Sequence, residues 1–196
     1  MEHVFIVFLI IGGTALLSWP LGAYMKRVMD PIPGRPDRWT SVFTRIGGAS
    51  EEQGWKSYLV TMLVFNAIMF TVTFSILALQ QFLPLNPDGM GPHDPTLVFN
   101  TAASFTTNTN LQHYSGEASM SYLSQLAGLM WLQFVSAATG IAALAALARG
   151  IAGRATLGNF LLDVQRASFL VLLPVALVVA VIMVLGGMPM TLQGSA

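Results

Sequence analysis

The sequence has few charged residues. Only 9% of its 196 residues are Asp, Glu, Lys or Arg, whereas soluble domains carry about 25%. A soluble protein this poor in charge would expose a large apolar surface and would aggregate. Because 54% of the residues are hydrophobic, we predict an integral membrane protein that contacts membrane lipid.

Cysteine is absent, which excludes disulfides, thiolate chemistry and cysteine-based metal sites. The three histidines, His3, His93 and His113, lie far apart in the sequence, so a zinc site is not expected. The net charge is zero, which leaves no basic surface for nucleic acid. No nucleophile–base pair or pair of carboxylates is evident, so no catalytic residue is assigned.

The apolar residues form four runs of the length needed to cross a membrane, about 20 residues. A secretory signal peptide is the competing interpretation of the first run, but Lys26 and Arg27 follow it instead of preceding it. We therefore expect an all-α transmembrane fold with about four spans. Its predicted parts are a first helix (1–25), a basic cytoplasmic loop (26–56), a helix–pore-loop–helix repeat (57–148), a cytoplasmic connection with an amphipathic segment (149–166), a last helix (167–187) and an outer tail (188–196).

On this plan all nine Lys and Arg face the cytoplasm, and both termini lie outside. Inside the second span, Asn66 is expected to hydrogen-bond to a neighbouring helix. In the third span, Gln133, Ser136, Thr139 and Gly140 share one helical face. That face lines either a wet path or an ordinary helix–helix contact.

A polar stretch, Phe99–Glu117, separates the second and third apolar runs. Just before it, Asp94 suits an N-cap and Pro95 suits the first helical position, which predicts a short helix over 95–105. About eleven residues cannot cross a bilayer. A short helix followed by polar backbone is typical of a re-entrant pore loop, because such backbone is tolerated at membrane depth only inside protein or beside a wet cavity. The alternative is a plain exterior loop.

A pore helix that enters from outside directs its C-terminal carbonyls towards the bilayer centre, where their partial negative charge favours a cation. The residues after it can turn backbone carbonyls towards an axis, and rings of carbonyls replace the hydration shell of an ion. Without an ionised side chain, such a site suits a large monovalent ion better than a divalent one. The candidate filter residues are Thr107, Asn108, Thr109 and Asn110, with Thr106, Gln112 and Glu117 at the mouth or in support.

The stretch F-N-T-A-A-S-F-T-T-N-T-N-L-Q-H-Y-S-G-E closely resembles the first pore loop of the potassium-binding, channel-like component of the Kdp-type potassium-transporting P-type ATPases. Further matching motifs are P-L-N-P at 84–87, S-x-L-x-Q-L-A-G-L at 121–129, S-A-A-T-G-I-A at 136–142 and T-L-G-N at 156–159. The resemblance implies a protein of the potassium-transporter superfamily, in a bacterial or archaeal inner membrane.

The resemblance also implies the transport role. The filter backbone near 106–112 would bind K⁺ from outside, and a partner P-type ATPase subunit would hydrolyse ATP with Mg²⁺. Small accessory membrane subunits would complete the complex. This chain contains neither a Walker-type glycine loop nor an Asp-Lys-Thr-Gly-Thr phosphorylation sequence.

The sequence departs from the family pattern at two points. Leu111 stands where the family commonly has Trp. The family also carries four pore-loop repeats and this sequence carries one, so a longer chain or other copies must supply the missing repeats of a closed ring. The alternatives to a transport component are therefore a non-conducting fragment or scaffold, and a minimal homo-oligomeric potassium channel.

Overall fold

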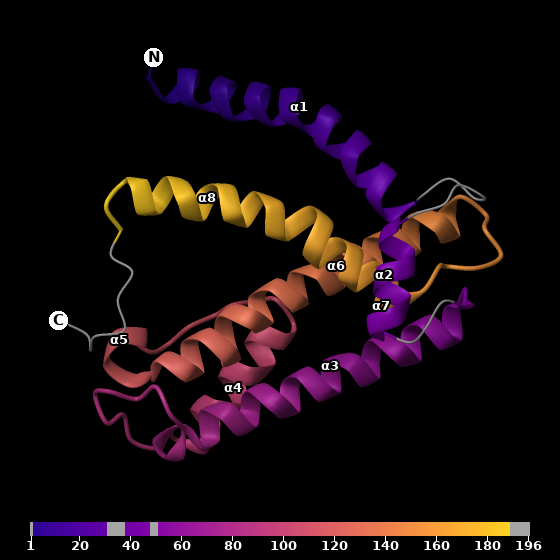
Figure 1. Ribbon diagram of the computed structural model, residues 1–196. Helices are drawn as coiled ribbons and strands as arrows, with labels where there is room; N and C mark the ends of the chain where they lie inside the picture. Colours follow the sequence, from indigo (N-terminus) through magenta and orange to yellow (C-terminus); the bar gives the residue numbers. More distant parts are fainter. Residues whose placement is uncertain (1, 31–37, 48–50, 189–196) are drawn as a thin grey trace.

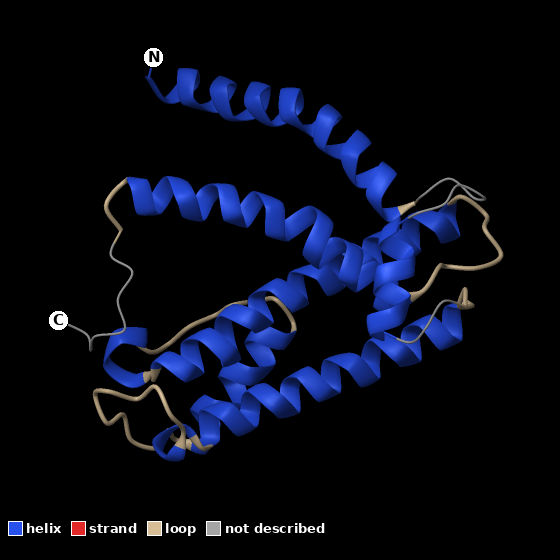
Figure 2. Ribbon diagram, viewed as in Figure 1, coloured by secondary structure: helices blue, strands red, loops and turns tan. Residues whose placement is uncertain are grey.

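A computed structural model describes residues 2–30, 38–47 and 51–188, and these ranges contain helices and no strand (Figures 1 and 2). The α-helices are α1 (Glu2–Met29), α2 (Arg38–Gly47), α3 (Trp55–Ala78), α4 (Pro95–Thr106), α5 (Gly116–Ser119), α6 (Trp131–Ile151), α7 (Phe160–Arg166) and α8 (Leu173–Leu185). A 3₁₀ turn, η1 (Gln80–Phe82), follows α3. Two segments are π-helical: η2 (Ser124–Met130) extends α6 at its N-terminal end, and η3 (Ala167–Leu172) joins α7 to α8.

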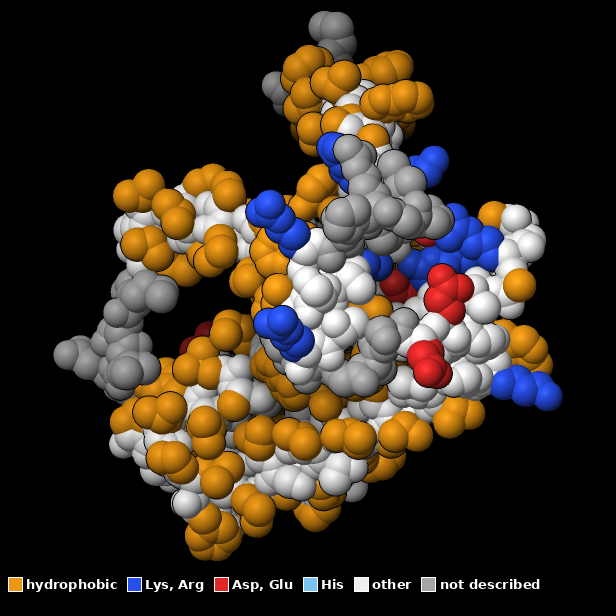
Figure 3. All heavy atoms as spheres, turned by 45° about the vertical axis from the view of Figure 1, so that its right-hand side comes forward, with side chains coloured by type: hydrophobic (Ala, Val, Ile, Leu, Met, Phe, Trp, Pro, Cys, Tyr) orange, Lys and Arg blue, Asp and Glu red, His pale blue; other side chains and the backbone are white. Residues whose placement is uncertain are grey.

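Four helical rods in these ranges are long and apolar enough to cross a membrane: Val4–Met29, Trp55–Ala78, Ser124–Ile151 and Phe160–Leu185. The predicted all-α transmembrane fold with about four spans is thereby confirmed. The rods meet at one end of the molecule, on the right of Figure 1 beside α2 and α7. Towards the other end the rods that contain α1 and α8 diverge from the rest, whereas those of α3 and α6 stay packed around α4. Apolar side chains cover much of their outer surface (Figure 3).

The cationic residues of the described ranges lie at the end where the spans meet, which we call the basic end. They are Lys26 and Arg27 in the last turn of α1, Arg38 and Arg45 in α2, Lys56 in the first turn of α3, and Arg149, Arg154 and Arg166 around the α6–α7 connection. Figure 3 shows blue side chains gathered there, with acidic ones among them. Which side of the membrane this end faces stays a prediction.

The helical rod that contains the predicted last span (167–187) starts earlier than that span. It begins at Phe160, where the side chain of Asn159 caps α7 by accepting a hydrogen bond from the Leu162 N–H at 3.1 Å. From there the rod continues without a break through η3 into α8. The second half of the segment predicted as an amphipathic connection is therefore helical and continuous with the last rod.

Two further expectations concern Asn66 and the predicted loops. Within the described ranges Asn66 bonds to no neighbouring helix: its Nδ2 donates to the carbonyl of Met62, one turn earlier in α3, at 2.8 Å. That prediction was wrong because a short polar side chain can satisfy itself on its own helix. The outer tail predicted for 188–196 lies outside the described residues except for Met188, as do residues 31–37 and 48–50 of the predicted basic loop.

Small residues let the spans approach closely near the basic end. Ala138, Ala142 and Ala146 recur every fourth residue of α6 and are buried against the start of α7 and α3. Phe160 fills the space between these helices, with its ring edge-on to that of Tyr58 at a centroid distance of 5.5 Å.

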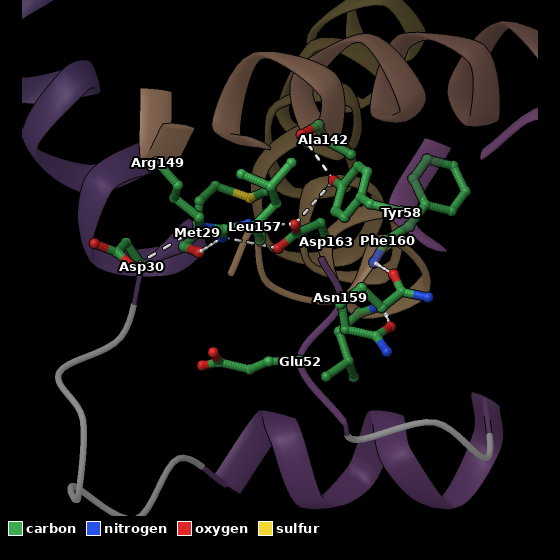
Figure 4. A network of polar contacts seen from close by, with 12 residues as sticks. Met29, Asp30, Glu52, Tyr58, Ala142, Arg149, Leu157, Asn159, Phe160 and Asp163 are labelled. Atoms are coloured by element: carbon green, nitrogen blue, oxygen red, sulfur yellow. Dashed lines mark hydrogen bonds and ion pairs between the residues drawn. The ribbon is translucent and has the colours of Figure 1, made fainter. Parts of the chain in front are cut away.

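A buried polar cluster fixes the same end (Figure 4). The guanidinium of Arg149, at the end of α6, makes a two-point ion pair with Asp163 of α7 and donates to the carbonyls of Met29 and Leu157. Tyr58 of α3 lies within hydrogen-bond distance of Asp163, at 3.0 Å. One side chain thus ties the ends of α1, α6 and α7 together and reaches α3 through Asp163.

The second core lies towards the other end and surrounds α4. Phe105 and Val98 of α4 are buried against Leu77 of α3 and Leu132 of α6. Figure 1 shows α4 held between these two spans and away from the basic end. This core sets the position of the short helix that leads into the candidate filter.

Candidate functional site

Helix α4 begins where the sequence predicts. The carboxylate of Asp94 accepts a hydrogen bond from the Thr96 N–H at 2.8 Å and another from the Thr96 hydroxyl, and Pro95 occupies the first turn. These bonds stabilise the charged carboxylate and hold the pKa of Asp94 below its ordinary value. The helix ends at Thr106, one residue beyond the predicted end.

The polar segment after α4 lies level with the middle of α6. The side-chain oxygen of Asn108 is 3.4 Å from the hydroxyl of Ser136, and Ser136 is near the middle of the span Ser124–Ile151. Helix α4 therefore directs its C-terminal end to mid-span depth, as expected of a re-entrant helix. Of the polar face predicted on α6, Ser136 contacts this segment, whereas Thr139 bonds to the carbonyl of Val135 in its own helix.

The end of α4 is a Schellman cap. The Thr109 N–H donates to the carbonyl of Ser104 at 2.9 Å, and the Asn108 N–H donates to the carbonyl of Phe105 at 3.2 Å. This cap requires a left-handed residue at its centre, which is Asn108 with φ +57°. Asparagine is the residue after glycine that visits this region most readily, which explains why it stands here.

A second asparagine repeats this conformation. Asn110 has φ +51°, and Thr109 between the two asparagines keeps a negative φ. The N–H groups of the residues in this turn lie on one side of the backbone. Here that side faces α4, since the N–H groups of both Thr109 and Asn110 donate to the carbonyl of Ser104.

The carbonyl groups of this segment are consequently free. Among the hydrogen bonds of the described chain, none ends on a carbonyl oxygen of residues 107–110. All four residues are exposed in this chain. The segment thus presents a row of unpartnered backbone oxygens beside the partly negative end of a helix, an arrangement that attracts a cation.

The side chains of the segment bond mainly to one another. The hydroxyls of Thr107 and Thr109 lie 2.9 Å apart, and Thr107 also donates to the carbonyl of Ala103 at 3.0 Å. Asn110 Nδ2 donates to Asn108 Oδ1 at 3.2 Å. These contacts bring the four predicted filter residues into one ordered turn without any ionised group.

The three predicted flanking residues lie on both sides of the segment, Thr106 in the last turn of α4 and the other two beyond Asn110. The hydroxyl of Thr106 is buried and has no hydrogen-bond partner in the described chain. Gln112 is exposed and lies 3.4 Å from the hydroxyl of Tyr114. Glu117, in α5, accepts a hydrogen bond from the Ser115 hydroxyl at 2.9 Å. A hydrogen bond from its own backbone N–H, together with the bond from Ser115, stabilises the charged carboxylate and lowers the pKa of Glu117. None of the three bonds to residues 107–110.

The sequence did not single out Ser104 or Gln80, which hold the loop and its surroundings. The hydroxyl of Ser104 accepts from the Leu111 N–H at 2.7 Å, across seven residues. Gln80 is fully buried and reaches four partners: it donates to the carbonyls of Gly91 and Ser119 and accepts from the Ser121 N–H and the Ser124 hydroxyl. The only sequence signal for Gln80 is an amide directly after a long apolar run.

No group of three or more His, Asp or Glu side chains comes together in the described ranges. A cation held at residues 107–110 would therefore be coordinated by backbone and hydroxyl oxygens. Such neutral ligands suit a weakly hydrated monovalent ion, whereas Ca²⁺ and Mg²⁺ usually recruit carboxylates.

Comparison with known proteins places these features in a family. A sequence profile described as "Potassium-transporting ATPase A subunit" matches residues 6–196. The potassium-transporting ATPase potassium-binding subunit of Alicyclobacillus acidocaldarius is 43% identical over 100% of this chain and 36% of its own length. The subunits of the same name from Mesorhizobium japonicum and Pseudomonas fluorescens are 48% and 45% identical, over 92% and 96% of this chain and 33% and 36% of their own lengths.

The chain thus spans about a third of the length of these relatives and matches their N-terminal part. The profile covers all four spans of the structure except the first two residues of Val4–Met29, and it covers the whole polar loop. The chain belongs to the family of potassium-transporting ATPase A subunits.

Proposed function

We propose that residues 106–112 form one strand of a potassium selectivity filter, and that three further strands come from pore loops outside this chain. The observation that carries this proposal is the row of carbonyl oxygens at 107–110 that accept no hydrogen bond in the described chain. One strand cannot surround an ion. Four such strands about a common axis would supply the ring of oxygens that replaces a hydration shell.

The electrostatics of the loop favour potassium over a more strongly hydrated ion. The C-terminal end of α4 contributes about half a negative charge, and the filter strand itself contributes neutral oxygens. This field is enough to offset the loss of weakly held water from a large monovalent ion. It is weak compared with the carboxylates that a divalent ion recruits.

In this proposal the chain is the channel-like part of an ATP-driven uptake complex. A partner P-type ATPase subunit binds ATP and Mg²⁺ and performs the hydrolysis, and small accessory membrane subunits complete the assembly. The complex lies in the bacterial or archaeal inner membrane. The basic end faces the cytoplasm, following the preference of Lys and Arg for that side, and both termini of this chain then lie outside.

The test uses the full-length subunit that contains this chain, assembled with its partner subunits. Asn108→Asp adds a charge in the filter and still tolerates the left-handed conformation. We expect the potassium concentration for half-maximal ATP hydrolysis to change at least tenfold and discrimination against Na⁺ to fall. Ser75→Ala is the control, because Ser75 bonds only to Thr71 on the exposed face of α3. Unchanged affinity and selectivity in Asn108→Asp and Gln112→Arg would contradict the proposal.

The chain by itself offers a second measurement. A homotetramer that carries potassium flux in liposomes would identify a minimal channel. A monomer without flux agrees with a filter that needs pore loops from outside this chain. The mass of the detergent-solubilised chain and a flux assay distinguish these outcomes.

A further inference from the structure

We infer that Ser104 is the positioning residue of the filter strand: its hydroxyl fixes the far end of the strand, at Leu111, to the pore helix. This inference rests on the proposed function, because it assigns a role within the same loop. Ser104 does not offer its side chain to the ion path. It acts through the backbone of residues 107–110.

The side-chain hydroxyl of Ser104 contacts both backbone polar groups of one residue, Leu111. It accepts from the Leu111 N–H at 2.7 Å and lies 3.3 Å from the Leu111 carbonyl, to which it can donate. Ser104 is 9% exposed. A buried hydroxyl with a short backbone contact seven residues away constrains the loop between the two residues.

The backbone carbonyl of Ser104 holds the middle of the same loop. It accepts the N–H groups of Thr109 at 2.9 Å and Asn110 at 3.3 Å, and the Thr107 hydroxyl lies 3.3 Å from it. Three consecutive N–H groups, those of residues 109, 110 and 111, therefore end on one residue. Because all three point towards Ser104, the carbonyls of the strand are left on the opposite side.

Other hydroxyls in the helices behave differently. Thr61, Thr71, Ser75 and Thr139 each donate to the carbonyl four residues earlier in their own helix, which is the usual bond of such residues within a helix. Ser104 turns its hydroxyl forward to the loop instead. The bond to Leu111 is thus specific to this site and is not the bond that hydroxyl side chains usually make within a helix.

The surroundings keep the Ser104 side chain in place. Its neighbour Phe105 is fully buried, and Ala102 of the preceding turn is also fully buried. The last turn of α4 is therefore packed inside the protein, where side chains have less freedom than at the surface. A small side chain with an oxygen on its first carbon is what the site accepts, and serine supplies it with the least bulk.

The experiment measures potassium-dependent ATP hydrolysis in the assembled complex with the full-length subunit. In Ser104→Ala the Leu111 N–H loses its partner while the Schellman cap, which uses only backbone atoms, remains. We expect the apparent potassium affinity to fall about tenfold, which corresponds to the loss of one hydrogen bond to a buried group. The maximal rate should stay within about twofold, since the catalytic subunit is unaltered. Discrimination against Na⁺ should also fall, a readout that a general loss of stability does not move.

Two more variants are measured in the same assay: Ser104→Cys as a graded substitution and Ser75→Ala as the control. The thiol is a weaker acceptor of similar size, so Ser104→Cys should give an intermediate affinity. If Ser104→Ala does not assemble, Ser104→Cys decides: a reduced affinity supports the inference and a wild-type affinity overturns it. Ser75→Ala should match the wild type, and an equal effect there would overturn the inference.

The proposed function and this inference can fail separately. If Asn108→Asp alters potassium affinity and Ser104→Ala does not, the inference about Ser104 is wrong and the filter proposal stands. If neither variant alters affinity or selectivity, the filter proposal fails and the inference fails with it. If both alter affinity, with the graded effect of Ser104→Cys, both are supported.

Discussion

Arg149 and Asp163 face each other in a two-point ion pair, with Nη1 2.5 Å from Oδ2 and Nη2 3.0 Å from Oδ1 (Figure 4). Both side chains are almost completely buried, at 8% and 2% exposed. Arg154 and Asp30 form a second pair close by, but Arg154 is 47% exposed. The two pairs share their chemistry and differ in their contact with solvent.

The buried pair should matter far more to stability than the exposed one. Removing one partner of a buried pair leaves an uncompensated charge and costs about 3–5 kcal/mol, so Arg149→Met should lower the unfolding temperature of the full-length subunit strongly. Arg154→Met is the matched control and should cost at most about 1 kcal/mol. Thermal unfolding in detergent measures both.

The double variant Arg149→Met with Asp163→Leu tests the cause. If the uncompensated charge is responsible, replacing both partners with apolar residues should recover much of the lost stability. A double variant as unstable as Arg149→Met would instead assign the loss to the bonds that Arg149 donates to Met29 and Leu157.

The buried pair of Arg149 and Asp163 leaves no room for a side chain at Gly158. The φ of Gly158 is +89°, and a Cβ at this position would lie 3.0 Å from Arg149 Cζ and still closer to Nη1. Gly158→Ala should therefore cost about 2–5 kcal/mol, from backbone strain together with the clash. Gly153 has φ +74° and open space around it, so Gly153→Ala should cost only the strain of about 1–2 kcal/mol. Equal losses in the two variants would show that the clash with Arg149 is relieved at no cost.

Local signals in the sequence predicted the elements that depend on local interactions. Asp94 and Pro95 carry the start of α4 because a cap and a first turn involve adjacent residues. The four spans followed from the length of their apolar runs. The proposed filter segment followed from polar residues between two of these runs and from the family resemblance, and its role stays a prediction.

Interactions between distant residues were not predictable in this way. In the sequence Arg149 resembles any other cationic residue at the end of a span. Only the fold brings its side chain to the carbonyl of Met29, 120 residues earlier. Ser104 reads as an ordinary residue of a short helix, because its partner Leu111 depends on the turn made by two left-handed asparagines. The helix that precedes residue 167 was not predicted, because Asn159 caps α7 ahead of a buried Arg and Asp, which resemble loop residues in the sequence.

The left-handed conformation of Asn108 predicts how substitutions at this position change the stability of the turn. Asn108→Val places a β-branched residue at φ +57° and should cost at least about 1–2 kcal/mol in this turn. Asn108→Gly removes that strain but also removes the contacts of the amide with Asn110 and Ser136.

The two substitutions should therefore affect thermal stability and potassium affinity differently. Asn108→Gly should retain wild-type stability with a weaker affinity, whereas Asn108→Val should lose both. Unfolding temperature and potassium-dependent ATP hydrolysis of the assembled complex measure the two properties. Equal stability in the glycine and valine variants would contradict the left-handed assignment.

The cap of α4 should respond to acid through Asp94. Its bonds to Thr96 hold its pKa below its ordinary value of 3.8, so the charged form is favoured in the folded protein. The contribution of this carboxylate to stability is therefore fully present above about pH 3.8 and is lost as the pH falls through the lower folded value. Amide hydrogen exchange in the first turn of α4, corrected for the intrinsic pH dependence, should accelerate over that window.

Asp94→Asn separates the charge from the cap. Asparagine keeps an oxygen that accepts from the Thr96 N–H but does not titrate, so its exchange in α4 should not change over the acid window. Glu117→Gln is the control, because Glu117 also has a lowered pKa but lies in α5 and bonds to Ser115. If exchange in α4 of Asp94→Asn still accelerated with acid as in the wild type, another group would be the one that titrates. Because the cap fixes the start of the helix whose end carries the filter strand, acid that releases Asp94 should also weaken potassium binding, and Asp94→Asn should not share that loss.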